Sequence, residues 1–244
     1  MEAIAKKTNL IYINILKAIA KKEKLFAILI DPEDFCVEKA EAIFAKLPVN
    51  ATHIFVGGST VSQEQTQTAI RSIKKYTQLP LVLFPGSYEQ ITSEADGILF
   101  LSLISGRNPE YLIEQHIQSV DSLRFSELEI IPTGYILIDG GKETAVQRVS
   151  KTTPIPRKSA ELVVKTALAG QFSGKKMIYL EAGSGALFPV PLDVIEAVKN
   201  AVSVPLIVGG GIHTTKQMED AYLAGADLVV IGTAFENQLF NDDF

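Results

Sequence analysis

The chain has 244 residues, of which 47% are hydrophobic; this is enough for a substantial core and argues against intrinsic disorder. Its formal net charge of −5 argues against nucleic acid as the main partner. The single cysteine, Cys36, excludes an internal disulfide framework and suits a reducing cytoplasm, where we expect the protein to be.

Strand and helix patterns alternate along the chain, and no linker or low-complexity stretch separates them. The first is an amphipathic helix over Thr8–Lys22, which we expect to pack on the domain rather than to anchor it on a membrane. Eight apolar runs follow, typical of parallel strands buried on both faces: Leu25–Asp31, Thr52–Val56, Leu81–Phe84, Gly97–Leu101, Leu128–Pro132, Lys176–Leu180, Leu206–Val208 and Asp227–Ile231. Helical patterns lie between most of them: Val37–Lys46, Ser62–Tyr76, Pro109–Ser122, Ser159–Ala169, Leu192–Ala201 and Thr215–Ala224.

These eight steps predict an α/β fold, a single (β/α)8 TIM barrel over residues 1–244 with an extra N-terminal helix. Two steps are irregular. Pro85–Asp96 leaves little room for a regular third helix, so we expect a gap in the barrel wall that could receive a long apolar ligand. Thr133–Lys158 is long instead and includes a second apolar run, Tyr135–Asp139.

The last three strands each end in a glycine-rich turn, at Gly183–Gly185, Gly209–Gly211 and Gly232–Thr233. Glycine lets backbone N–H groups approach an anion closely, and a following helix N-terminus adds positive potential. The last two turns are typical of the phosphate site after the seventh and eighth strands of a TIM barrel. The alternative is that they are tight turns and nothing more.

Acidic residues also lie at strand ends of the expected barrel. Asp31 with Ser59 would suit Mg²⁺, which accepts hard oxygen ligands and needs few protein groups when substrate phosphates complete its shell. Alternatively, Asp31 caps a helix. Glu181 could accept a proton from a substrate hydroxyl, or it could be a carboxylate tied to backbone N–H groups. Arg107 and Lys142 fall in loops where they could meet a second anion or stay solvated.

Six motifs occur in order: Asp31–Asp34 (DPED), Val56–Thr60 (VGGST), Phe84–Ser87 (FPGS), Pro132–Tyr135 (PTGY), Tyr179–Gly185 (YLEAGSG) and Val208–Ile212 (VGGGI). Together they resemble the geranylgeranylglyceryl phosphate synthase family, which includes the bacterial heptaprenylglyceryl phosphate synthases. The likeness runs from about Leu25 to Phe235. It implies a barrel without its third helix that transfers a polyprenyl group, geranylgeranyl in the first instance, from its diphosphate to the 3-hydroxyl of sn-glycerol 1-phosphate, with Mg²⁺.

The resemblance also implies roles for individual residues. Asp31 and Ser59 would bind Mg²⁺, and Glu181 with Tyr179 would be catalytic. The residues implied for glycerol phosphate binding are Tyr179, Leu180, Glu181, Ala182, Gly183, Ser184, Gly185, Gly209, Gly210, Gly232 and Thr233. One branch of the family has a lysine where this chain has Leu29, so the chain is similar to the other branch, and diphosphate neutralisation is left to other groups.

Two alternatives remain at this point. One is another phosphate-binding barrel enzyme, an isomerase or lyase, although no strand-end lysine supports it. The other is a non-catalytic module that binds a phosphorylated metabolite, which would not need a metal site opposite a base. We further expect a homo-oligomer with at most peripheral membrane contact, since no segment approaches the roughly 20 apolar residues of a bilayer span.

Overall fold

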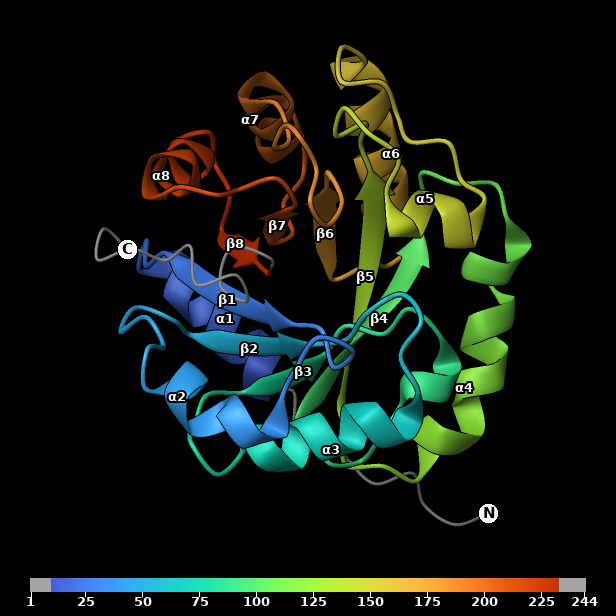
Figure 1. Cartoon of the computed structure of the whole chain (residues 1–244). Coiled ribbons are helices and arrows are strands. Elements are labelled where there is room, and N and C mark those ends of the chain that lie inside the picture. Colours follow the sequence, from blue (N-terminus) through green and yellow to red (C-terminus); the bar gives the residue numbers. More distant parts are fainter. Residues whose placement is uncertain (1–9, 233–244) are drawn as a thin grey trace.

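The computed structural model describes residues 10–232 and contains a closed barrel of eight parallel strands, each paired with its neighbour in chain order (Figure 1). The strands are β1 Leu25–Ile30, β2 His53–Val56, β3 Leu81–Leu83, β4 Gly97–Leu103, β5 Glu129–Leu137, β6 Met177–Glu181, β7 Leu206–Gly209 and β8 Leu228–Ile231. Helices outside the strands are α2 Ala40–Phe44, α3 Gln63–Ile73, α4 Glu114–Arg124, α6 Ala160–Phe172, α7 Leu192–Ala201 and α8 Thr215–Leu223. The TIM barrel that the alternation predicted is confirmed.

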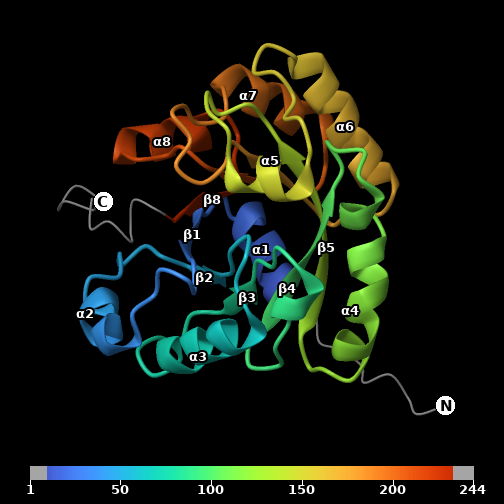
Figure 2. The same cartoon turned by 45° about the vertical axis from the view of Figure 1, so that its right-hand side comes forward.

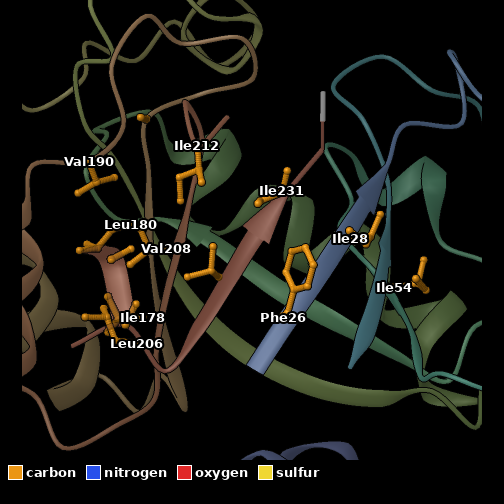
Figure 3. Packing of buried hydrophobic residues seen from close by; sticks show 14 of the residues in the cluster. Phe26, Ile28, Ile54, Ile178, Leu180, Val190, Leu206, Val208, Ile212 and Ile231 are labelled. Atoms are coloured by element: carbon orange, nitrogen blue, oxygen red, sulfur yellow. The ribbon is translucent and has the colours of Figure 1, made fainter. Parts of the chain in front are cut away.

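The strands are apolar on both faces because alternate side chains enter two separate hydrophobic clusters. Residues such as Phe55 and Leu99 belong to the inner cluster, which fills the barrel. Their neighbours, such as Ile54 and Ile98, belong to the outer cluster beneath the helices. Figure 3 shows part of this outer cluster around β1, β2, β6, β7 and β8. This two-sided burial is the reason why the strands read as continuous apolar runs.

The N-terminal helix α1 (Leu10–Ala20) packs against the strands rather than in the outer layer of helices (Figure 2). Its buried residues Ile11 and Ile15 belong to the inner cluster. The Glu129 carboxylate at the start of β5 accepts hydrogen bonds from the backbone N–H groups of Ile11 (2.6 Å) and Tyr12 (2.9 Å). A negative charge at a helix N-terminus is stabilising, so Glu129 fixes this helix onto the barrel. The predicted packing of an N-terminal helix on the domain is confirmed.

The third helix is replaced by a single 3-10 turn, η2 (Tyr88–Gln90), and the gap expected in the wall is present. β3 and β4 pair only at Val82 with Gly97 and at Leu83 with Ile98, whereas β4 and β5 pair along seven residues. The two strands therefore separate beyond Ile98. The buried Gln90 side chain ties this turn to the loops after β3 and β2 by accepting from Gly86 N–H (2.9 Å) and donating to the Gly58 carbonyl (2.9 Å).

The expectation for the fifth strand was wrong in one respect. We placed its end at Pro132, but β5 continues to Leu137 and includes the second apolar run. Pro132 lacks an N–H group but its carbonyl still accepts from Lys176 N–H (2.7 Å). Pairing with β4 along seven residues and with β6 along five residues from Thr133 onward thus carries β5 through the proline.

Two helical segments also differ from the sequence expectation. The segment at 37–46 splits into a 3-10 turn, η1 (Val37–Lys39), and the short α2, and the segment at 109–122 splits into η3 (Pro109–Tyr111) and α4. An unexpected helix, α5 (Ala145–Ser150), follows β5, with Thr144 Oγ1 accepting from Gln147 N–H (3.3 Å) as its cap. Within residues 10–232, no helix is long and apolar enough to cross a membrane.

Replacing Glu129 with Gln tests the attachment of α1. Glu129 is 3% exposed, and the amide would turn one of two accepting oxygens into a donor that faces an N–H group. We expect Glu129→Gln to lower the free energy of unfolding by about 1–3 kcal/mol in urea titrations. The nearby Glu127→Gln is the matched control, because Glu127 is exposed; an equal loss in both variants would contradict the role of Glu129.

Candidate active site

A cavity of about 860 Å³ lies at the carboxyl ends of the strands, where active sites of this fold are found. At the barrel mouth it is lined by Asp31 and Glu181. It also reaches Ile98, Phe100 and His116, which lie on the outer side of β4. The cavity therefore passes through the opening between β3 and β4 and joins a polar mouth to an apolar groove.

Glu181 ends β6 and is the most perturbed acid of the mouth. Its side chain is 5% exposed, and burial raises the pKa to about 7, although the Gly183 N–H group, which donates to Oε1 (2.6 Å), opposes this shift. Gly210 has φ +80°, and a Cβ atom there would collide with the Glu181 carboxylate. The glycine turn after β7 thus makes room for a carboxylate that can exchange a proton near neutral pH.

Tyr179 lies two residues before Glu181, so its side chain also points into the barrel. It is fully buried and its hydroxyl has no hydrogen-bond partner within the described part of the chain. Burial, and then the negative charge of Glu181, raise the Tyr179 pKa, so the phenol keeps its proton. Its ring lies against Tyr135 (centroids 5.3 Å apart) and Phe84 (5.4 Å). An unpartnered buried hydroxyl beside a carboxylate suits a ligand hydroxyl that would use both.

Most residues predicted for glycerol phosphate surround the same space. Those that line the cavity are Tyr179, Glu181, Ser184, Gly185, Gly210 and Gly232. The side chains of Leu180 and Ala182 belong to the outer cluster instead, so only their backbone is available to a ligand. The backbone groups of Gly183 and Gly209 bond to other residues of the site. Gly183 N–H donates to the Glu181 carboxylate, and the Gly209 carbonyl accepts from Ala182 N–H (3.1 Å). Thr233 lies outside the described residues.

The structure brings Asp31 and Ser59 to the opposite side of the mouth, where both line the cavity. Gly58 packs so closely on Asp31 that a Cβ atom there would overlap its carboxylate. The pKa of Asp31 is raised, mainly by burial and in addition by the charges of Asp34 and Glu33. A hydrogen bond from Glu33 N–H (3.0 Å) opposes this shift. This negative, oxygen-rich corner fits Mg²⁺, provided that substrate oxygens supply further ligands.

Two observations qualify the metal site. No group of three or more His, Cys, Asp or Glu side chains among residues 10–232 could hold a metal alone. The alternative that Asp31 caps a helix was wrong, because the next helical turn begins only at Val37. Asp31 caps a loop turn, which leaves its carboxylate at the cavity.

The cations that the sequence singled out have different positions. Arg107 donates to the carbonyls of Gly106 (2.6 Å) and Ile104 (3.5 Å), so it braces its own loop. Lys142 lies over the turn after β6, where a Cβ atom at Gly185 would be 3.2 Å from Nζ. Sequence reasoning missed Arg148, which lines the cavity from α5 and pairs with Glu143 at 3.8 Å. No signal could have revealed it, because α5 itself was not predicted.

The geometry agrees with comparisons to known proteins. The model of the PcrB family matches residues 17–243. The chain is 59% identical to the geranylgeranylglyceryl phosphate synthase of Zunongwangia profunda, and the match covers 93% of this chain and 97% of that relative. It is 52% identical to the geranylgeranylglyceryl phosphate synthase of Flavobacterium johnsoniae, with coverage of 93% of this chain and 94% of the relative. The crystal structure of (S)-3-O-geranylgeranylglyceryl phosphate synthase from Thermoplasma acidophilum with sn-glycerol-1-phosphate has a TM-score of 0.87, 34% identity, and coverage of 93% of this chain and 91% of that one.

The raised pKa of Glu181 predicts a pH-dependent stability difference. The folded carboxyl titrates at about 7 and the unfolded one at about 4.5, so the folded state binds more protons between these values. The stability that this group contributes is complete below pH 4.5 and is lost as pH rises to 7. The free energy of unfolding of Glu181→Gln minus that of the wild type should therefore increase by up to about 3 kcal/mol from pH 4.5 to 7.

His53 supplies a control with the opposite sign. Burial lowers its pKa to about 4 from 6.5, so its contribution to stability is lost as pH falls through this range. The difference for His53→Gln should change in the opposite direction in denaturant titrations at pH 5, 6 and 7. A pH-independent difference for Glu181→Gln would contradict the raised pKa.

Proposed function

The chain belongs to the PcrB family, and from this premise we propose that it joins a polyprenyl group, geranylgeranyl in the first instance, to the 3-hydroxyl of sn-glycerol 1-phosphate. The donor is the polyprenyl diphosphate and pyrophosphate is released, which makes the protein a prenyltransferase of ether lipid synthesis. The observation that carries this proposal is a continuous cavity, which joins a buried carboxylate and glycine turns to an apolar groove through the wall. A phosphosugar isomerase or a binding module has no use for such a groove.

The acceptor, sn-glycerol 1-phosphate, occupies the turns after β6, β7 and β8. Its phosphate lies at Gly183–Gly185, Gly210 and Gly232, where glycine backbone and small side chains allow close approach of N–H donors. The Thermoplasma acidophilum relative was crystallised with this compound. The 3-hydroxyl then points toward Glu181 and Tyr179, and it gives the buried Tyr179 hydroxyl the hydrogen-bond partner that it lacks within residues 10–232.

Glu181 is the base of the reaction. Its carboxylate accepts the proton of the 3-hydroxyl while that oxygen forms a bond to carbon 1 of the prenyl group. The bond from carbon 1 to the diphosphate oxygen breaks, and pyrophosphate leaves with the electron pair. A pKa near 7 lets Glu181 be partly ionised at neutral pH and still hold a proton once it has accepted one. Tyr179 donates its phenolic proton in a hydrogen bond that orients the attacking hydroxyl.

Asp31 and Ser59 are the groups that would hold Mg²⁺, with diphosphate oxygens and water as its other ligands. When bound, the ion supplies positive charge that stabilises the departing pyrophosphate. Arg148 is the one Arg or Lys side chain that lines the cavity within residues 10–232, so we assign the remaining diphosphate charge to it. Arg148 would thereby supply the positive charge that a lysine supplies in the other branch of the family at the position of Leu29.

The polyprenyl tail lies in the groove on the outer side of β4. Ile98 and Phe100 form its floor, and Tyr88 and Ser119 also line it. His116 closes one side, with its ring 4.4 Å from Phe100 (centroid to centroid) and its Nε2 donating to the Leu101 carbonyl (2.7 Å). Burial of an apolar chain here contributes about 0.8 kcal/mol per methylene, so the groove can hold the donor.

Three expectations accompany this function. We propose that the protein acts in the cytoplasm, that it forms a homo-oligomer, and that it contacts membranes only at the periphery when the product is delivered. Membrane contact is expected because the product is a lipid whose apolar tail favours the bilayer over water.

The transfer reaction is tested with purified protein, geranylgeranyl diphosphate, sn-glycerol 1-phosphate and Mg²⁺, by following pyrophosphate and the ether product. We expect turnover that stops with a chelator, and a loss of kcat by about 100-fold or more in Glu181→Gln because the base is removed. Binding of sn-glycerol 1-phosphate, measured by calorimetry, should persist in this variant.

The enantiomer sn-glycerol 3-phosphate is the control substrate, and we expect it to react poorly because its 3-position carries the phosphate. If no prenyl diphosphate, of whatever chain length, releases pyrophosphate with sn-glycerol 1-phosphate, the proposed synthase function is refuted. Unchanged kcat in Glu181→Gln would remove Glu181 from the mechanism but leave the reaction in place.

The role of Arg148 is tested by Arg148→Gln. Loss of a charged contact to the diphosphate should raise KM for the prenyl diphosphate about tenfold and leave KM for sn-glycerol 1-phosphate unchanged. Lys165→Gln is the matched control, since Lys165 also pairs with a surface carboxylate, Glu161 (2.6 Å), but lies on α6 outside the cavity. Equal donor KM values in Arg148→Gln and the wild type would refute the assignment.

A further inference from the structure

Arg157 is half-buried behind the glycine turns, and no step of the proposed reaction uses it. It lies between α5 and α6, beyond the lining of the cavity. Its Nη1 donates to the carbonyls of Asp139 (3.1 Å) and Pro189 (2.8 Å). Its guanidinium carbon lies 5.3 Å from the centroid of the Phe188 ring. One side chain thus joins the loop after β5 to the far end of the loop after β6.

The loop after β6 contains the turn at 183–185 and is held by polar contacts on two sides. The Gly140 carbonyl, after β5, accepts from the N–H groups of Leu187 (2.9 Å) and Phe188 (3.1 Å). The Ala186 carbonyl accepts from His213 Nε2 (3.4 Å), which belongs to the loop after β7. Burial anchors this loop at Ala182 (0% exposed) and Ala186 (2%), but Leu187 is 61% exposed and Phe188 53%. The part of the loop from Leu187 to Pro189 therefore depends on the hydrogen bonds for its position.

Arg157 can act as a fixed point because its own segment is tied to the barrel. Ile155 N–H donates to the Leu137 carbonyl (2.9 Å), and the Ile155 carbonyl accepts from Asp139 N–H (2.9 Å). Ile155 thereby pairs with Ile138 in an isolated parallel bridge that extends the end of β5. The guanidinium is always charged and planar, which makes its hydrogen bonds to two carbonyls strong and directional.

We propose that Arg157 is a positioning residue for sn-glycerol 1-phosphate: it clamps the loop at 182–189 in the shape that receives the phosphate, without touching the substrate. This inference rests on the proposed function for the identity of the ligand. The clamp acts on the acceptor half of the site, because Arg157 bonds only to the loops after β5 and β6 among the described residues. Asp31 and Ser59, which face the donor, lie in the loops after β1 and β2.

The test combines steady-state kinetics with amide hydrogen exchange on Arg157→Gln and Arg157→Lys. In Arg157→Gln we expect KM for sn-glycerol 1-phosphate to rise about tenfold, because an uncharged side chain leaves the two carbonyls weakly bound. KM for geranylgeranyl diphosphate should stay at the wild-type value. The amides of Leu187 and Phe188 should exchange about tenfold faster in the free protein, since their bonds to Gly140 open more often.

Arg157→Lys should fall between the wild type and Arg157→Gln, because an ammonium keeps the charge but not the planar fork. Arg124→Gln is the control for loss of an arginine beside a phenylalanine: Arg124 lies 4.6 Å from the Phe125 ring at the end of α4. We expect it to change neither KM.

Three results would overturn the clamp: equal changes in both KM values, unchanged exchange at Leu187 and Phe188, or wild-type behaviour of Arg157→Lys. The exchange measurement needs no substrate. It therefore tests the clamp even if the transfer reaction is absent, and failure of the proposed function remains distinguishable from failure of this inference.

Discussion

A parallel sheet that closes on itself directs the carboxyl ends of all its strands to one rim, and this closure is the constraint that builds the site. Asp31 after the first strand and Gly232 after the last become neighbours around one cavity although they lie near opposite ends of the chain. Burial of the strands on both faces keeps the rim in place. The low polarity of the same barrel interior raises the pKa of Glu181, so the packing that stabilises the fold also prepares the base.

The opening between β3 and β4 is the main departure from a complete barrel, and polar side chains compensate for the backbone groups it leaves free. The Leu101 carbonyl, beyond the last pair of these strands, accepts from His116 Nε2. Ser102 lies 3.3 Å from the same nitrogen and accepts from Lys175 Nζ (2.7 Å). Burial lowers the pKa of both His116 and Lys175, consistent with a network inside the helical layer. The wall can be open to a ligand at Leu101 because the partner of this carbonyl comes from α4 and not from β3.

Local patterns in the sequence predicted the features that depend on local chemistry. Apolar runs gave the eight strands, and the short Pro85–Asp96 step gave the missing helix. The predicted fifth strand ends too early because Pro132 is a local signal for an end, whereas pairing with β4 and β6 beyond the proline is not visible in the sequence. Asp31 and Glu181 stood out since acids at strand ends point to the mouth. Arg148 did not, because the helix α5 that directs it to the cavity was not predicted, and Arg157 did not, because its partners Asp139 and Pro189 lie in two other loops.

A groove that runs along the outside of a barrel wall also sets the route by which a tailed product departs. A lipid held at its head by the glycine turns can swing its tail out sideways, and it need not be drawn end-first through the mouth. Each methylene that passes from Ile98 and Phe100 into water costs about 0.8 kcal/mol, whereas passage into an apolar phase costs nearly nothing. For such a product, the missing third helix makes the flank of the barrel, between α3 and α4, its unloading side (Figure 2).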